Sequence, residues 1–150
     1  MNIFILDKDP VRAAEMLCDK HLPKMIVESG QMLSTAHRLL DGTPTKKPSK
    51  SGKTMQTYYV LQDPREEVLY AAVHKGHPCT KWTMESKCNY YWHYQHFEAM
   101  GQEYTYRRSK THSTIELLSS ILKNKPINIP DSGLTEFAQA MSHFPECKVD

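Results

Sequence analysis

Residues 18–42 read CDKHLPKMIVESGQMLSTAHRLLDG, and this stretch decides the fold class. Proline is tolerated in the first turn of a helix but breaks its interior, so Pro23 marks a helix start, and Gly42 is a natural stop. Between them one stripe of mainly apolar side chains recurs at spacings of three and four: Leu22, Ile26, Ser29, Leu33, Ala36 and Leu40. This spacing predicts a long amphipathic helix.

Further helix signals lie on both sides of this stretch. Asp9 is a typical N-cap and Pro10 suits the first helical position, so a short helix is expected there, and the Asp63–Pro64 pair predicts another start. A long helix ending near Arg107 and Arg108 is expected from aromatic and small residues at helical spacing, namely Tyr90, Tyr94, Phe97, Gly101 and Tyr104.

The remaining segments are shorter. We expect a helix over 113–123, a final turn over 138–141, a short strand at YYVL (58–61), and a strand or extended segment at NIFIL (2–6). The predicted fold is mainly α, a compact single-domain helical bundle with long loops.

The composition is that of one globular domain. The chain has 150 residues, 39% of them hydrophobic, and 19 basic against 17 acidic residues give a net charge of only +2, which does not by itself demand a nucleic-acid partner. Four scattered cysteines without a CxxC pair fit reduced thiols. Because no apolar stretch could span a bilayer or serve as a signal peptide, we expect an intracellular protein with no membrane contact.

One segment is strongly basic. Residues 42–57 read GTPTKKPSKSGKTMQT and carry four lysines but no acid. The Pro, Gly and Ser content favours irregular structure. We therefore expect a basic mobile loop over 43–57.

A polar stripe opposes the apolar face of the long helix and consists of His21, Lys24, Glu28, Gln31, Thr35 and Arg38. It is either a solvated helix face or the lining of a groove for an anionic substrate. Two turns, about 10 Å, separate His21 from Glu28, so they would act on different atoms unless the chain bends.

Histidines and cations gather further along the chain. His74, His77, His93 and His96 form two HxxH spacings, but a third clear ligand is missing, so we expect hydrogen-bonded histidines at the edge of an aromatic core and no metal. The stretch YTYRRSKTH (104–112) suits a helix C-terminus, and also phosphate contact and base stacking. With the basic loop and the lysines at 20 and 24, it would complete one cationic surface.

The segments CDKHLPKMI, QMLSTAHRLLDG, HPCTKW, NYYW and EYTYRR resemble a family of small uncharacterised proteins of T4-like phages, especially those of cyanobacteria. This resemblance implies a phage protein in the cytoplasm of the infected bacterial host. KHLPK and the Gly76–His77 pair are also similar to motifs of the pyrimidine-dimer DNA glycosylases of phage endonuclease V type. That family implies a compact helical domain that flips a nucleotide and cleaves its N-glycosidic bond with an N-terminal amine and one glutamate.

Two positions depart from the glycosylase pattern. His21 stands where the family has its glutamate, and Asn2 is larger than the family's small second residue, so we expect Met1 to be retained and no covalent amine adduct to form. His21 would then act as general acid or base, or donate to a phosphate, and Glu28 or Asp19 would supply the missing carboxylate.

The predicted site follows from these comparisons. The catalytic candidates are His21, Glu28 and Asp19. The candidates for nucleic-acid or nucleotide binding are Lys20, Lys24, Arg38, His77, Trp82, Arg107, Arg108 and His112. No cofactor is expected.

Three functions remain open. The first is a protein of DNA-glycosylase-like architecture that binds DNA or nucleotides. Hydrolysis of an N-glycosidic bond and binding without catalysis are both open for it. The second is an anti-defence protein that binds, sequesters or degrades an immune nucleotide signal in a pocket lined by His21, Glu28, His77, Trp82 and Arg107. The third is a non-catalytic phage protein that binds a partner. The oligomeric state is left open.

Overall fold

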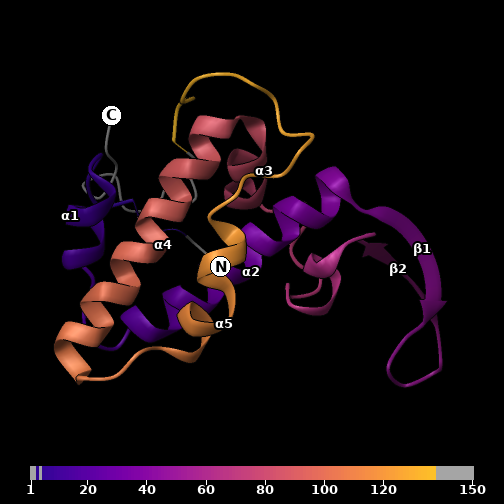
Figure 1. Ribbon diagram of the computed structural model, residues 1–150, viewed down its shortest axis with the longest axis horizontal. Helices are drawn as coiled ribbons and strands as arrows, with labels where there is room; N and C mark the ends of the chain where they lie inside the picture. The colour runs from indigo at the N-terminus through magenta and orange to yellow at the C-terminus, as the bar shows by residue number, and fades with distance from the viewer. Residues whose placement is uncertain (1–2, 4, 138–150) are drawn as a thin grey trace.

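The computed structural model is mainly helical, as the sequence predicts, and describes residue 3 and residues 5–137 (Figure 1). A short 3-10 helix and one two-stranded sheet accompany the helices in these residues. The elements are α1 (Pro10–Glu15), α2 (Leu22–Asp41), β1 (Thr43–Pro48), β2 (Met55–Val60), η1 (Pro64–Glu67), α3 (Pro78–Glu85), α4 (Lys87–Arg108) and α5 (Ser113–Leu122). The turn expected over 138–141 lies outside the described residues.

Helix α2 is the centre of the fold and confirms the helix predicted from residues 18–42. Its apolar face is buried: Leu22, Ile26, Leu33 and Ala36 are at most 1% exposed. Helices α3, α4 and α5 all pack against it, and α1 packs against α4. Two core clusters result, one around α2, α4 and α5, the other joining Ile3 to α3.

Helix α5 approaches its neighbours at glycines. A Cβ atom on Gly30 of α2 would lie 2.9 Å from Cγ2 of Thr114, and one on Gly101 of α4 would lie 2.6 Å from Cδ1 of Ile115. Because these two glycines have no Cβ atom, α5 can pack close to both α2 and α4.

The segment over 43–57, expected as a loop, consists largely of an antiparallel hairpin. Strand β1 pairs with β2 in a register that places Thr43 opposite Val60, and the strand expected at YYVL is the end of β2. The prolines of β1, at 44 and 48, suggested irregular structure. Both strands of a two-stranded sheet are edge strands, however, and a proline is tolerated where its missing N–H would face solvent.

The helix expected after Asp63 is short. Asp63 caps it, accepting from the Arg65 backbone N–H at 3.0 Å, but η1 ends at Glu67. The backbone carbonyls of Glu66, Leu69 and Tyr70 accept hydrogen bonds from the Arg38 guanidinium. Arg38 of α2 thus occupies backbone carbonyls that would accept intrahelical hydrogen bonds if η1 continued.

Residues 3, 5 and 6, where a strand or extended segment was expected, carry neither helix nor strand. Among the described helices, none is long and apolar enough to cross a membrane.

Candidate functional site

The start of α2 and the end of α4 meet at one end of the molecule. Arg107 donates to the Asp19 carboxylate at 2.9 Å and to the Glu15 carbonyl at 3.2 Å. Arg108 donates to the Asp19 backbone carbonyl at 3.3 Å. These contacts join segments almost ninety residues apart, and they place KHLPK beside the YTYRR stretch.

His112 tightens the same junction. Its Nδ1 accepts from the Thr114 backbone N–H at 3.1 Å and so caps α5, while its ring packs edge-on against Tyr104 with centroids 4.9 Å apart. Partial burial lowers the pKa of His112, and a hydrogen bond to the Pro23 backbone opposes that effect. Pro23 has no N–H, so the His112 ring donates to its carbonyl.

We call residues 19–24 together with 104–112 the cationic end. These ranges contain five lysine and arginine residues and a single carboxylate. His21, Lys20, Lys24 and Arg108 are exposed there, whereas the Arg107 guanidinium is held by carboxylates on both sides, since Glu103 also accepts from it at 2.9 Å. The exposed cations are available to an anionic ligand.

Glu28 lies further along the same face of α2. Residues seven apart share a helix face, so His21 and Glu28 are aligned about 10 Å apart. Glu28 is half-buried beside α3. Burial raises the pKa of the Cys79 thiol, and the nearby Glu28 carboxylate adds to this effect, while a hydrogen bond from the Ile3 backbone opposes it. Glu28 thus lies on the polar face of α2 close enough to α3 for its charge to act on Cys79.

Arg38, at the far end of that stripe, is an internal residue with 6% exposure. All five of its N–H groups have acceptors: the carbonyls of Tyr59, Glu66, Leu69 and Tyr70 and the Glu66 carboxylate, at 2.6 to 3.1 Å. This side chain is a structural clamp between α2, β2 and η1.

Two other predicted binding residues, His77 and Trp82, belong to the N-cap and the interior of α3. His77 caps this helix, with its Nδ1 accepting from the Cys79 backbone N–H at 3.1 Å. Trp82 is 2% exposed, and its ring packs against Trp92 and Phe137 at centroid distances of 5.9 and 5.4 Å. The Trp82 ring is therefore part of the core.

The histidines of α4 are buried and hydrogen-bonded at the edge of the aromatic core, as expected. His93 contacts the hydroxyls of Thr83 and Ser29 at 2.8 and 3.0 Å, and burial lowers its pKa to about 3. His96 contacts the Pro10 carbonyl at 3.0 Å through Nδ1. The residues that the structure describes contain no cluster suited to a metal ion.

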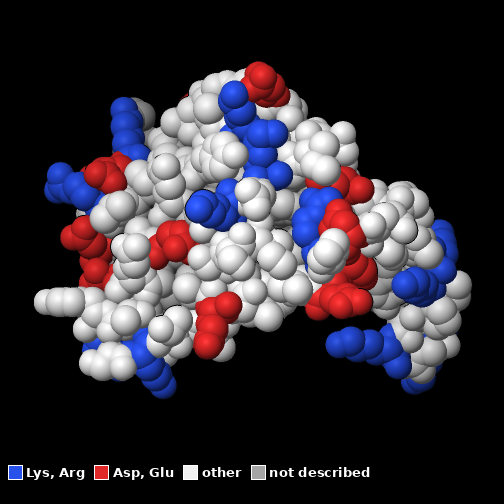
Figure 2. Space-filling model, viewed as in Figure 1, with Lys and Arg blue, Asp and Glu red and all other residues white. Residues whose placement is uncertain are grey.

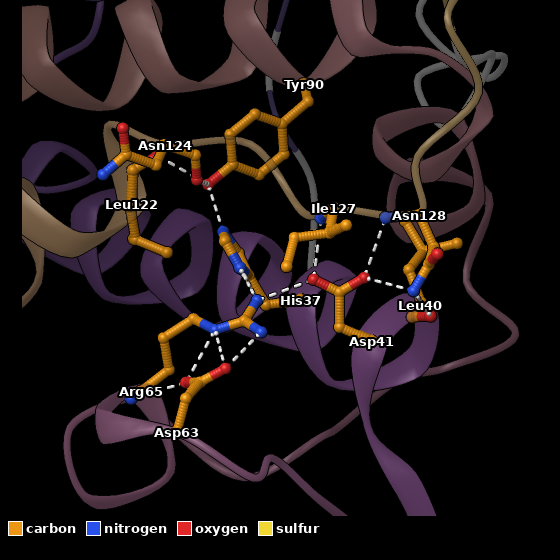
Figure 3. Close-up of polar contacts among 10 residues, drawn as sticks. All are labelled: His37, Leu40, Asp41, Asp63, Arg65, Tyr90, Leu122, Asn124, Ile127 and Asn128. Carbon is orange, nitrogen blue, oxygen red and sulfur yellow. Dashed lines mark hydrogen bonds and ion pairs between the residues drawn. The ribbon is translucent and has the colours of Figure 1, made fainter.

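A buried network around His37 was not found from the sequence (Figure 3). The Tyr90 hydroxyl donates to the Leu122 carbonyl at 2.6 Å and lies 2.8 Å from His37 Nε2, so it accepts from that ring nitrogen. His37 Nδ1 then accepts from Arg65 at 2.9 Å. The neutral ring is thereby favoured, and burial together with the Arg65 charge lowers the pKa of His37 to about 4.

Arg65 ties this network to two carboxylates. It donates to Asp41 at 2.7 Å and to Asp63 at 2.7 Å. Asp41 also accepts from the backbone N–H groups of Ile127 and Asn128 at 2.7 and 2.9 Å. No sequence motif could have revealed this network. Most of its contacts join residues more than 20 positions apart, and the contact of Arg65 with Asp63 lies within a turn of ordinary composition. The network connects α2, η1, α4 and the segment after α5.

Two hollows among the described residues lie away from the cationic end. One of about 740 Å³ lies between the hairpin and residues 66–73, and Arg38 is the only predicted site residue in its lining. Another of about 320 Å³ lies beside His37 and Arg65 and is lined by none of the predicted site residues. The five residues expected to form a nucleotide pocket are divided: His21 and Arg107 lie at the cationic end, Glu28 lies further along α2, and His77 and Trp82 belong to the cap and interior of α3. Neither of these two hollows unites them.

A comparison with protein families identifies the family of the chain. Residues 1–117 match the family described as pyrimidine dimer DNA glycosylase. No curated protein and no solved structure matches the chain. The matched range covers 117 of 150 residues, from the chain start through α4 and into α5, and so includes both segments of the cationic end. The chain therefore belongs to the pyrimidine dimer DNA glycosylase family.

Proposed function

We propose that this protein binds DNA at the cationic end and acts there on a base or its N-glycosidic bond. The observation that carries this proposal is the contact of Arg107 and Arg108 with Asp19, which sets KHLPK and YTYRR side by side. The family supports a DNA substrate. The exposed cations suit phosphate groups, which contribute most of the affinity in many protein–DNA complexes.

The polar face of α2 supplies the candidate groups for chemistry. His21 is exposed at the start of α2, and histidine is the side chain that most often serves as a general acid or base. Glu28 is a half-buried carboxylate on the same face, suited to stabilising positive charge that develops on the sugar. Asp19 accepts from Arg107, so we assign it to positioning this arginine.

The proposed reaction is a hydrolysis. Water adds to C1′ of the sugar, the N-glycosidic bond breaks, and the base leaves with its bonding electrons and is protonated. His21 would take the proton from water or give one to the base. A covalent DNA adduct trapped with borohydride would contradict this route, because such an adduct requires an amine nucleophile.

Binding is tested with a labelled duplex titrated at increasing salt. Phosphate contacts release counterions, so the affinity should fall steeply between about 50 and 200 mM salt. Calorimetry with mononucleotides and cyclic nucleotides separates this proposal from the nucleotide-signal alternative, for which the nucleotide would bind and the duplex would not. No salt-sensitive duplex binding at low ionic strength would refute DNA binding.

Chemistry is tested on a duplex that contains a pyrimidine dimer. We expect cleavage of one N-glycosidic bond of the dimer under single-turnover conditions, seen as an alkali-labile abasic site, with undamaged duplex as the control. The freed base stays attached to its neighbour through the dimer. A protein that binds both duplexes and leaves both intact would be a DNA-binding member of the family without this activity.

A further inference from the structure

The hairpin at the opposite end of α2 concentrates positive charge. No acidic residue occurs between positions 42 and 62, while Lys46, Lys47, Lys50 and Lys53 all fall in this range and are exposed. Figure 1 shows the hairpin projecting from the helical body, and Figure 2 shows blue atoms on it, with the red atoms lying toward the body. We call residues 46–54 the hairpin tip.

The strand register gives the two strand lysines no carboxylate partner, although Glu66 lies near enough to Lys47 for the lysine's charge to help lower the pKa of that carboxyl. Lys46 lies opposite Thr57 and Lys47 opposite Gln56, so neither has a carboxylate across the sheet. In the described part of the chain, no ion pair involves a lysine of the hairpin tip. The repulsion among four like charges is therefore not offset by an ion pair there.

The tip has a defined shape. The Ser49 backbone N–H donates to the Thr54 carbonyl at 2.7 Å, and the Gly52 N–H donates to the Ser49 carbonyl at 2.9 Å. Gly52 has φ of 73°, a left-handed conformation that glycine adopts without strain. This turn holds Lys50 and Lys53 at the outer end of the hairpin.

The inner face of the hairpin borders the hollow of about 740 Å³. Its polar lining combines the two lysines at 47 and 50 with hydroxyl groups, from Ser49, Ser51, Thr54 and Thr57. Glu66 also borders the hollow, but its carboxylate accepts from Arg38 at 2.6 Å, so its negative charge is balanced by the guanidinium. The lining thus has an excess of positive charge and hydroxyl donors, which is the chemistry that binds phosphate oxygens.

The base of the hairpin is anchored. Arg38 donates to the Tyr59 carbonyl of β2 at 2.9 Å, and the same guanidinium binds the segment 66–70. A ligand that contacts the tip therefore engages an arm fixed to α2. Helix α2 has 20 residues, so about 30 Å of helix separates this arm from the cationic end.

We infer that the hairpin tip is a second DNA contact, which binds the phosphate backbone of the duplex away from the cationic end. This inference rests on the proposed DNA binding. Lysines and hydroxyls contact phosphates without reading base edges, so the arm would add affinity that is independent of sequence and of damage.

The test compares two double variants of equal charge. Lys50→Gln/Lys53→Gln alters the tip, and Lys81→Gln/Lys123→Gln removes two exposed lysines from α3 and from the end of α5. Each is titrated with a labelled undamaged duplex over a range of salt. For the tip variant we expect the slope of log K against log salt to become shallower by about 1.8, since each lost phosphate contact contributes about 0.9. The control should keep the wild-type slope.

The outcomes separate the two proposals. Wild-type binding together with an unchanged slope in the tip variant would overturn the hairpin inference and leave DNA binding at the cationic end standing. Equal slope changes in both variants would also overturn it, because the effect would then follow net charge. A wild-type protein that fails to bind duplex would refute both. Thermal melting of each variant checks that the fold is intact.

Discussion

At the scale of single residues, position along a helix decides whether a charged side chain is structural or available to a ligand. Lys24 and Arg38 belong to the same polar stripe of α2, yet Lys24 is exposed while Arg38 is 6% exposed with every donor occupied. Arginine suits this buried place because its planar fork presents five donors that keep their charge. The stripe therefore divides into an accessible part at the helix start and an internal part near its end.

Arg38→Ala should destabilise the protein strongly. The change leaves four backbone carbonyls and the Glu66 carboxylate without their donor. Each buried acceptor left without a partner costs about 1 to 3 kcal/mol, whereas Glu66, whose side chain is 38% exposed, can turn to water. Urea denaturation measures the free energy of unfolding. Arg38→Lys keeps the charge but not the fork, so it should restore only part of the loss; a variant as stable as wild type would contradict the clamp.

His21→Ala and Lys24→Ala should separate chemistry from binding. The first should lower the single-turnover rate about 100-fold or more while the dissociation constant changes little, because a general acid or base acts in the transition state. The second should weaken binding and reduce the salt slope by about 1, as expected for one phosphate contact.

Lys81 is exposed on α3, and Lys81→Ala is the control for the removal of a positive charge. Rates and dissociation constants are measured on the same dimer-containing duplex. Full turnover by His21→Ala would exclude the role given to this imidazole.

At the scale of elements, capping residues and periodicity predicted α1, α2, α5 and the end of α4, but they did not predict α3 and they overestimated the helix after Asp63. Asp9 accepts from the Val11 N–H at 2.9 Å as an N-cap should, and α2 begins and ends within one residue of the predicted limits. The hairpin could not be predicted in this way, because its strands carry exposed lysines and prolines instead of an alternating apolar pattern. Its pairing is a contact between segments, which composition does not encode.

Gly101→Ala tests the close approach of α5 to α4. Alanine favours a helix by about 1 kcal/mol over glycine, but its Cβ would lie 2.6 and 2.7 Å from two carbon atoms of Ile115. Overpacking costs about 1 to 3 kcal/mol, so we expect a net loss of stability and a lower Tm. Gly76→Ala has nothing within 4 Å of the added Cβ and should be close to neutral. Equal Tm values for both variants would refute the close packing.

At the scale of the whole molecule, buried neutral histidines link stability to pH. The pKa of His37 falls from 6.5 to about 4 and that of His93 to about 3, with burial as the largest cause. The unfolded chain therefore takes up these protons at a higher pH than the folded chain does. The free energy of unfolding should therefore be highest above about pH 6.5 and should decrease as the pH falls toward 4.

For His37 alone the loss should reach about 3 kcal/mol, at about 1.4 kcal/mol per pKa unit. Urea midpoints measured between these pH values give the dependence. His37→Gln removes the titrating ring, so the variant should show a flatter pH dependence over this window even if it is less stable throughout. A slope identical to that of wild type would show that His37 is not the group responsible.

The sequence by itself determined the mainly helical class, both limits of α2, the end of α4 and the basic composition of the two segments of the cationic end. Helix periodicity, caps and glycine stops act within a few residues, so local chemistry suffices to predict them. Tertiary structure alone decided that Arg38 and Trp82 are internal, that KHLPK meets YTYRR, and that His37 joins Arg65 and Tyr90. These outcomes depend on contacts between distant segments, and the burial and electrostatic environment of each side chain exist only once those segments have packed.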